Sequence, residues 1–236
     1  MNLLSPLDTF DSDDWRHDIF GADGACPILI EPGDSRTILI SGENGCGKSL
    51  LARALGVVAR RHNIALDKSF EVMRIGMELR TSEGMHRAFL FGDEATDSTG
   101  KISIGTVLSG ISTIRGRQNP HWLILDEPDV GVGEGYRHAI GEYLAEASRD
   151  LPSKTLGLIV ITHAREIAGP MMEAGASSIR VGDDLRPVRE WLAHGDLPKS
   201  IEDLQSLSSR VTQRFRDVER TIREGREAPT AQGPRR

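Results

Sequence analysis

The stretch "ILISGENGCGKSLLARAL", residues 38–55, passes from an apolar segment through a glycine-rich turn into helix-forming residues. Residues 42–49 match the pattern G-x-x-x-x-G-K-[ST] in full. Glycines let the backbone curl so that successive N–H groups point at a phosphate, and the N-terminus of the following helix adds its positive dipole end. The stretch therefore predicts a phosphate-binding loop between a strand and a helix, and an α/β fold.

The loop supplies most of the predicted binding residues. Lys48 is expected to reach the β- and γ-phosphates and to act in catalysis, and the Ser49 hydroxyl is expected to bind Mg²⁺. The residues predicted to contact the nucleotide in this part of the chain are Gly42, Asn44, Gly45, Cys46, Gly47, Lys48, Ser49 and Leu50.

Two further apolar segments end in polar residues. "HWLILDEP" predicts a buried strand that ends at Asp126 and Glu127, and "TLGLIVITH" predicts a second strand followed by His163. Asp126 is the expected Mg²⁺ ligand, Glu127 the residue that polarises the attacking water, and His163 a γ-phosphate sensor. The alternative is that these are solvated acids and a surface histidine at strand ends.

Four segments are predicted along the chain: an irregular acidic arm (1–26), an ATPase domain (27–192), a C-terminal helical segment (193–225) and a disordered tail (226–236). Within the domain, helices are expected over 48–61, 104–117 and 134–149, strands in "FEVMRI" and "RAFLF", and an edge strand in "SSIRV". The C-terminal segment carries a heptad-like apolar stripe. Its docking on the protein's own body is favoured over a partner-binding zipper.

Composition limits the functional classes. A net charge of -6 argues against a general nucleic-acid coat, so nucleic-acid binding is possible in principle but unsupported by charge. No run approaches the roughly 20 apolar residues of a membrane span. Cys26 and Cys46 are the two cysteines and offer no disulfide framework, which together with the absence of a readable leader in the N-terminal sequence predicts a cytoplasmic protein.

These motifs together resemble the ABC-type ATPases, which include transporter ATP-binding subunits and soluble relatives of the SMC, RecF and MutS kind. "GENGCGKS" is similar to the family's phosphate loop, "LILDEP" to its magnesium strand with a catalytic glutamate, and "VITH" to its switch-histidine segment. The resemblance covers much of residues 37–163. It implies a P-loop NTPase fold with a mostly parallel central sheet and helices on both faces, with ATP and Mg²⁺ as cofactors.

The family also has a signature, L-S-G-G-Q, that binds the γ-phosphate held by the opposite subunit. Aligning "NPHWLILDEP" with the family pattern places the signature serine at Ser103, followed by Gly105, with Ile104 and Thr106 departing from the pattern. Ser103 is then expected to cap the N-terminus of the helix over 104–117. Ser109 in "LSG" is the less favoured candidate, because it lies too close to Asp126.

Three departures from the family pattern bear on function. The family's γ-phosphate-sensing glutamine has no counterpart, and Asp93 and Glu94 are weak candidates to replace it. The short distance from Lys48 to Ser103 implies a reduced helical subdomain. The loop after Glu127 lacks the usual final aspartate.

The function expected from this resemblance is an ATPase in which two copies close head to tail on ATP and hydrolysis reopens them, switching an unidentified protein effector, with DNA maintenance or defence as candidate roles. The alternatives are an ATP-binding subunit of a membrane transporter, for which the reduced subdomain makes a membrane partner less favoured, and a nucleotide-gated scaffold with little turnover.

Overall fold

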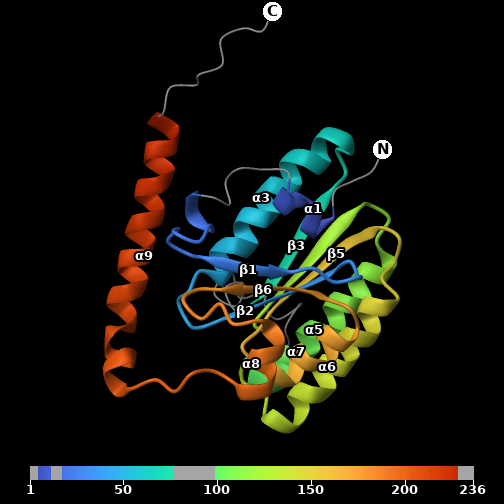
Figure 1. Cartoon of the computed structure of the whole chain (residues 1–236). Helices are drawn as coiled ribbons and strands as arrows, with labels where there is room; N and C mark the ends of the chain where they lie inside the picture. The colour runs from blue at the N-terminus through green and yellow to red at the C-terminus, as the bar shows by residue number, and fades with distance from the viewer. Residues whose placement is uncertain (1–4, 12–17, 77–98, 228–236) are drawn as a thin grey trace, which may run out of the picture.

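The computed structural model describes residues 5–11, 18–76 and 99–227 and contains a six-stranded sheet (Figure 1). In chain order the strands are β1 (Ile28–Glu31), β2 (Thr37–Gly42), β3 (Glu71–Gly76), β4 (His121–Asp126), β5 (Thr155–Ile161) and β6 (Ser177–Val181). Their spatial order is β1-β6-β2-β5-β4-β3, and all neighbouring pairs are parallel except β1 with β6. The predicted mostly parallel sheet is confirmed.

Helices cover both faces of this sheet, as predicted. α3 (Lys48–Leu66) and the short α1 (Pro6–Asp11) lie on one face, and α5 (Thr99–Gly116), α6 (Glu134–Arg149), α7 (Arg165–Glu173) and α8 (Val188–His194) lie on the other (Figure 1). Alternate side chains of the apolar strands enter the two cores. In β2, for example, Ile38 and Ile40 pack against α3 while Leu39 packs toward α5 and α7.

The strand register brings the predicted site segments to one edge of the sheet. Asp126 at the end of β4 is level with Ile161 at the end of β5, and Ile161 is in turn level with Ile40 of β2. The phosphate loop follows β2 and His163 follows β5 within two residues. Because the strands are parallel, these loops leave the sheet on the same side.

The structure corrects three expectations about elements. The segment 1–26 is not wholly irregular, since it contains α1, whose Pro6 lies where a Cβ on Gly157 of β5 would fall, and the buried Phe20. "SSIRV" is not an edge strand, because β1 pairs antiparallel along its outer side. The helix expected over 104–117 already begins at Thr99.

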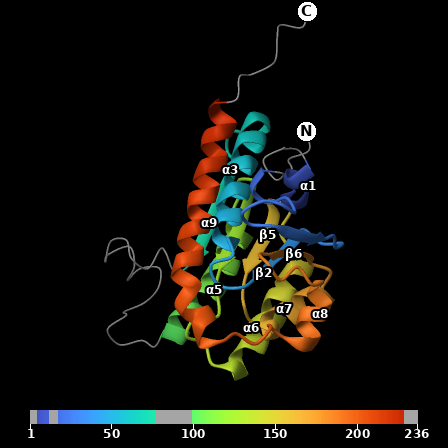
Figure 2. The same ribbon diagram turned by 60° about the vertical axis from the view of Figure 1, so that its left-hand side comes forward.

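The last helix, α9 (Ile201–Glu227), stands outside the two layers (Figures 1 and 2). It continues two residues into the predicted tail, and the remainder of that tail lies outside the described residues, as do "RAFLF", Asp93 and Glu94. In the described part of the chain, no helix has the length and apolar character needed to cross a membrane.

Candidate functional site: a phosphate loop under a helix

The loop after β2 adopts a backbone that its glycines permit. Gly42, Gly45 and Gly47 have φ values of 151°, 70° and 108°, a region that side chains disfavour. A Cβ at Gly42 would lie 2.2 Å from the Val181 carbonyl oxygen, and one at Gly47 would lie 2.5 Å from Cys26 Sγ. Gly47 is also the N-cap of α3 and supplies no side-chain cap, so the first N–H groups of this helix are left for another acceptor.

Lys48 is folded back over its own loop. Its Nζ donates to the carbonyl oxygens of Gly42, at 3.1 Å, and Glu43, at 2.8 Å, and the residue is 6% exposed. Burial lowers the pKa of the Lys48 ammonium, and the nearby carboxylates of Glu127 and Asp126 oppose that effect. The ammonium is therefore held at the loop by weak neutral acceptors, which a phosphate oxygen can replace.

The two predicted Mg²⁺ ligands lie side by side. Ser49 Oγ is 3.4 Å from Asp126 Oδ2, and Arg74 of β3 forms an ion pair with the same carboxylate oxygen. One hydroxyl and one carboxylate fit a Mg²⁺ ion that takes its remaining ligands from phosphates and water. Among the described residues, no group of three or more His, Cys, Asp or Glu side chains is arranged as a metal site.

Glu127 and His163 form the next pair. Glu127 Oε1 is 3.4 Å from His163 Nε2, at ion-pair range, and the proximity of the histidine, supported by the charge of Lys48, lowers the pKa of the Glu127 carboxyl. Glu127 has a φ of 51°, and among the described residues other than glycine it alone has positive φ. Such a strained backbone is typical of functional sites.

The loop that carries Glu127 is fixed from both sides. Thr162 Oγ1 donates to Asp129 Oδ1 at 2.8 Å, and Ser103 Oγ donates to the Val130 carbonyl oxygen at 2.6 Å. Thr162, Ser103 and Asp129 are buried. These contacts join α5, the loop after β4 and the end of β5 into one support for the carboxylate.

The expectation that Ser103 caps a helix N-terminus is wrong. Ser103 is the fifth residue of α5, is 1% exposed, and turns its hydroxyl toward the chain's own loop. Gly105 lies on the outer face of the same helix with open space around it. Neither is among the residues that line the two cavities at the phosphate loop, so their contact with the nucleotide of a second copy stays a prediction.

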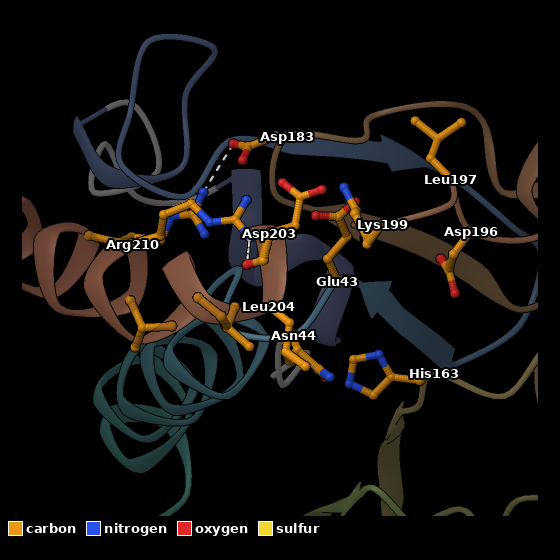
Figure 3. Close-up of a pocket in the computed structure, with 13 residues that line it drawn as sticks. Glu43, Asn44, His163, Asp183, Asp196, Leu197, Lys199, Asp203, Leu204 and Arg210 are labelled. Carbon is orange, nitrogen blue, oxygen red and sulfur yellow. Dashed lines mark hydrogen bonds and ion pairs between the residues drawn. The ribbon is translucent and has the colours of Figure 1, made fainter. Parts of the chain in front are cut away.

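Two cavities flank the phosphate loop beneath α9. The first, of about 300 Å³, lies between Glu43, Asn44 and His163 on the body and the N-terminal half of α9 (Figure 3). The second, of about 260 Å³, contains Gly45, Gly47, Lys48, Ser49, Leu50 and Glu127 together with Val211, Phe215 and Val218 of α9. Asn44 lines both, and its side chain is directed toward the ring of His163 in Figure 3. Cys46 is buried beside the loop, and burial raises the pKa of its thiol.

The structure thus brings together the predicted loop residues with Asp126, Glu127 and His163. Sequence reasoning missed Arg74 and the residues of α9. An arginine within the apolar strand "EVMRIG", two positions before the carboxyl end, is a signal that could have indicated Arg74. Nothing in the apolar stripe of α9 indicates which surface it faces. Comparison with known proteins names no family, since no protein-family model matches the chain and no curated protein matches its sequence.

Proposed function

We propose that this protein is a P-loop ATPase of the ABC type, which binds MgATP, closes head to tail with a second copy and uses hydrolysis to switch a protein partner. The observation that best supports this is the gathering of Lys48, Ser49, Asp126, Glu127 and His163 at one edge of a parallel sheet. Each has the chemistry that one part of phosphoryl transfer requires.

The phosphates are proposed to lie in the curl of the loop against the free N–H groups at the start of α3. Lys48 then exchanges the carbonyl oxygens of Gly42 and Glu43 for phosphate oxygens, so that the ammonium pairs with an anion in place of two uncharged acceptors. Ser49 and Asp126 would hold a Mg²⁺ ion, which would neutralise charge on the phosphate oxygens. Arg74 has to release Asp126 for this to occur.

Glu127 is proposed to orient the attacking water. Its lowered pKa keeps the side chain a carboxylate at neutral pH, so that it accepts a hydrogen bond from the water as the bond to the γ-phosphorus forms and the bridging P–O bond breaks. His163, 3.4 Å from that carboxylate and beside Asn44, is proposed to contact the γ-phosphate.

This mechanism is tested with Glu127→Gln. The substitution removes the carboxylate while keeping a similar shape, so we expect phosphate release to fall by at least about 100-fold while MgATP still binds. Phosphate release and equilibrium binding of a fluorescent ATP analogue measure the two properties. Glu134→Gln, which changes an exposed glutamate at the start of α6, is the matched control. Equal phosphate release by wild type and Glu127→Gln would exclude Glu127 from the chemistry.

A nucleotide-gated scaffold with little turnover is the second candidate. The inward hydroxyl of Ser103 favours it, because a partner's γ-phosphate would then lack that ligand. Under this alternative, wild type binds MgATP but releases phosphate no faster than Glu127→Gln, with or without nucleic acid or protein partners.

A further inference from the structure

The helix α9 lies across the open side of the phosphate loop. Its residues line both cavities at that loop, opposite Asn44 in the first (Figure 3) and opposite Lys48 and Glu127 in the second. The contact with the loop is direct, since a Cβ placed on Gly45 would lie 2.3 Å from Val211 Cγ2. A 27-residue helix of this chain therefore occupies the space in front of the nucleotide site.

Two basic side chains, Arg214 of α9 and Lys199 of the segment before it, make polar contacts at the loop. Arg214 donates to the carbonyl oxygens of Ala25 and Gly45, at 2.8 and 3.0 Å, and to Asp183 Oδ1 at 3.0 Å. Lys199 Nζ is 2.6 Å from Glu43 Oε1, which raises the pKa of the lysine. Each of the two side chains thus contacts a residue of the phosphate loop itself, Gly45 for Arg214 and Glu43 for Lys199.

Apolar burial adds little to this docking. Leu204 and Phe215 are each 63% exposed although they line the cavities, whereas Val218 is 4% exposed and packs with Cys26 and Phe20. A helix buried along its whole apolar face would gain a few kcal/mol for each large side chain. Among these three side chains of α9, only Val218 contributes this stabilisation in full. Releasing α9 from the loop therefore costs little free energy of apolar burial.

We propose that α9 is a lid: it shields the phosphate loop in the single chain and has to leave before a second copy can close on bound nucleotide. The inference rests on the proposed head-to-tail dimerisation. In the proposed dimer the second copy approaches the nucleotide from the side of Asn44 and Gly45, and residues of α9 cover that side. Lid and partner therefore exclude each other. Because both copies have to open, the apparent affinity of the dimer is proportional to the square of the fraction of chains whose lid is open.

The test is a double substitution, Lys199→Ala with Arg214→Ala, in the Glu127→Gln background and in full-length protein. Removing both contacts favours the open lid, so sedimentation velocity in MgATP should show half-dimerisation at a protein concentration lower by about tenfold. Arg216→Ala is the matched control, because Arg216 is an exposed arginine of the same helix that is not among the residues lining the two cavities. A dimer that forms at the same concentration in all three proteins would overturn the lid while leaving the proposed function in place.

A second measurement separates failure of the lid from failure of the ATPase proposal. A zero-length carbodiimide condenses a carboxylate and an amine in contact, so the Glu43–Lys199 pair should give a cross-linked peptide in nucleotide-free Glu127→Gln protein, and MgATP should reduce its yield. Amide hydrogen exchange of residues 43–50 should also be faster in the double variant than in Arg216→Ala. If none of the proteins dimerises but the cross-link and the exchange difference are seen, dimerisation fails and shielding stands. If the cross-link is absent and exchange is unchanged, α9 is not a lid.

Discussion

Asp184→Asn tests the electrostatic support beneath the phosphate loop. Asp184 follows β6 in the segment whose Gly182 packs against Cys46, and its carboxylate accepts hydrogen bonds from Arg186 Nε at 2.8 Å, Arg186 Nη2 at 2.7 Å and Arg180 Nη2 at 3.0 Å. Arg180 is fully buried, with its guanidinium carbon 4.9 Å from the centre of a Trp191 ring. Replacing the carboxylate leaves this buried guanidinium without its anionic partner.

The magnitude follows from the pKa of Asp184. Hydrogen bonding by Arg186, with the added charge of Arg180, lowers this pKa from 3.8 to about 2. A difference of nearly two units corresponds to about 2 kcal/mol of the free energy of unfolding at neutral pH. Because the folded-state pKa is the lower one, this stabilisation is fully present above about pH 4 and is lost as the pH falls toward 2, with roughly half remaining at pH 3.

The assay is urea unfolding followed by tryptophan fluorescence, for wild type and Asp184→Asn, between pH 7 and pH 3. We expect the variant to be less stable by about 2 to 3 kcal/mol at pH 7, and the difference to shrink by about 1 kcal/mol at pH 3. Glu190→Gln is the control, because this exposed carboxylate is 3.9 Å from Arg186 and should change stability by less than about 1 kcal/mol at either pH. A difference between wild type and Asp184→Asn that stays constant with pH would refute the reasoning.

Two further substitutions test the support of the site. Thr162→Val removes the 2.8 Å hydrogen bond to the buried Asp129 carboxylate and the 2.9 Å bond accepted from the Ala164 N–H, so the free energy of unfolding should fall by about 1 to 3 kcal/mol; a variant as stable as wild type in urea would show that these bonds contribute nothing. Arg74→Met frees the Asp126 carboxylate of its competing cation, so Mn²⁺, used in place of Mg²⁺, should bind to the protein with ATP at a concentration lower by about threefold in electron paramagnetic resonance titrations. Unchanged or weaker Mn²⁺ binding would show that Arg74 does not compete with the metal.

The central sheet could be predicted because its strands are continuous apolar runs that end in recognisable polar residues. β4 and β5 are buried on both faces, so apart from their end residues their sequences are apolar and do not alternate with polar residues. Asp126 ends β4, and His163 follows the carboxyl end of β5. The convergence of these residues with Lys48 and Ser49 followed from parallel strand order alone. The site could therefore be assembled from local patterns and one topological rule.

The errors have a common origin in tertiary packing. The helix α5 begins at Thr99, before the expected start at 104, and its first turns are held by the burial of Ile102 and Ser103 against the body. "SSIRV" was placed at an edge because nothing local shows that the short β1 adds outside it. The apolar stripe of α9 indicated that one face of this helix packs against another surface. Which surface it contacts depends on the hydrogen bond from Arg214 to the Gly45 carbonyl oxygen, 169 residues away in sequence.

The most direct test of the central claim is the affinity of the chain for MgATP, measured by isothermal titration calorimetry in wild type, Lys48→Ala and Lys68→Ala. Lys68 is an exposed lysine just after α3 and controls for loss of charge. If the loop holds the triphosphate, wild type and Lys68→Ala bind MgATP alike, and Lys48→Ala binds it at least about 100-fold more weakly. Equal affinity of Lys48→Ala and wild type, or no binding by wild type, would contradict the claim.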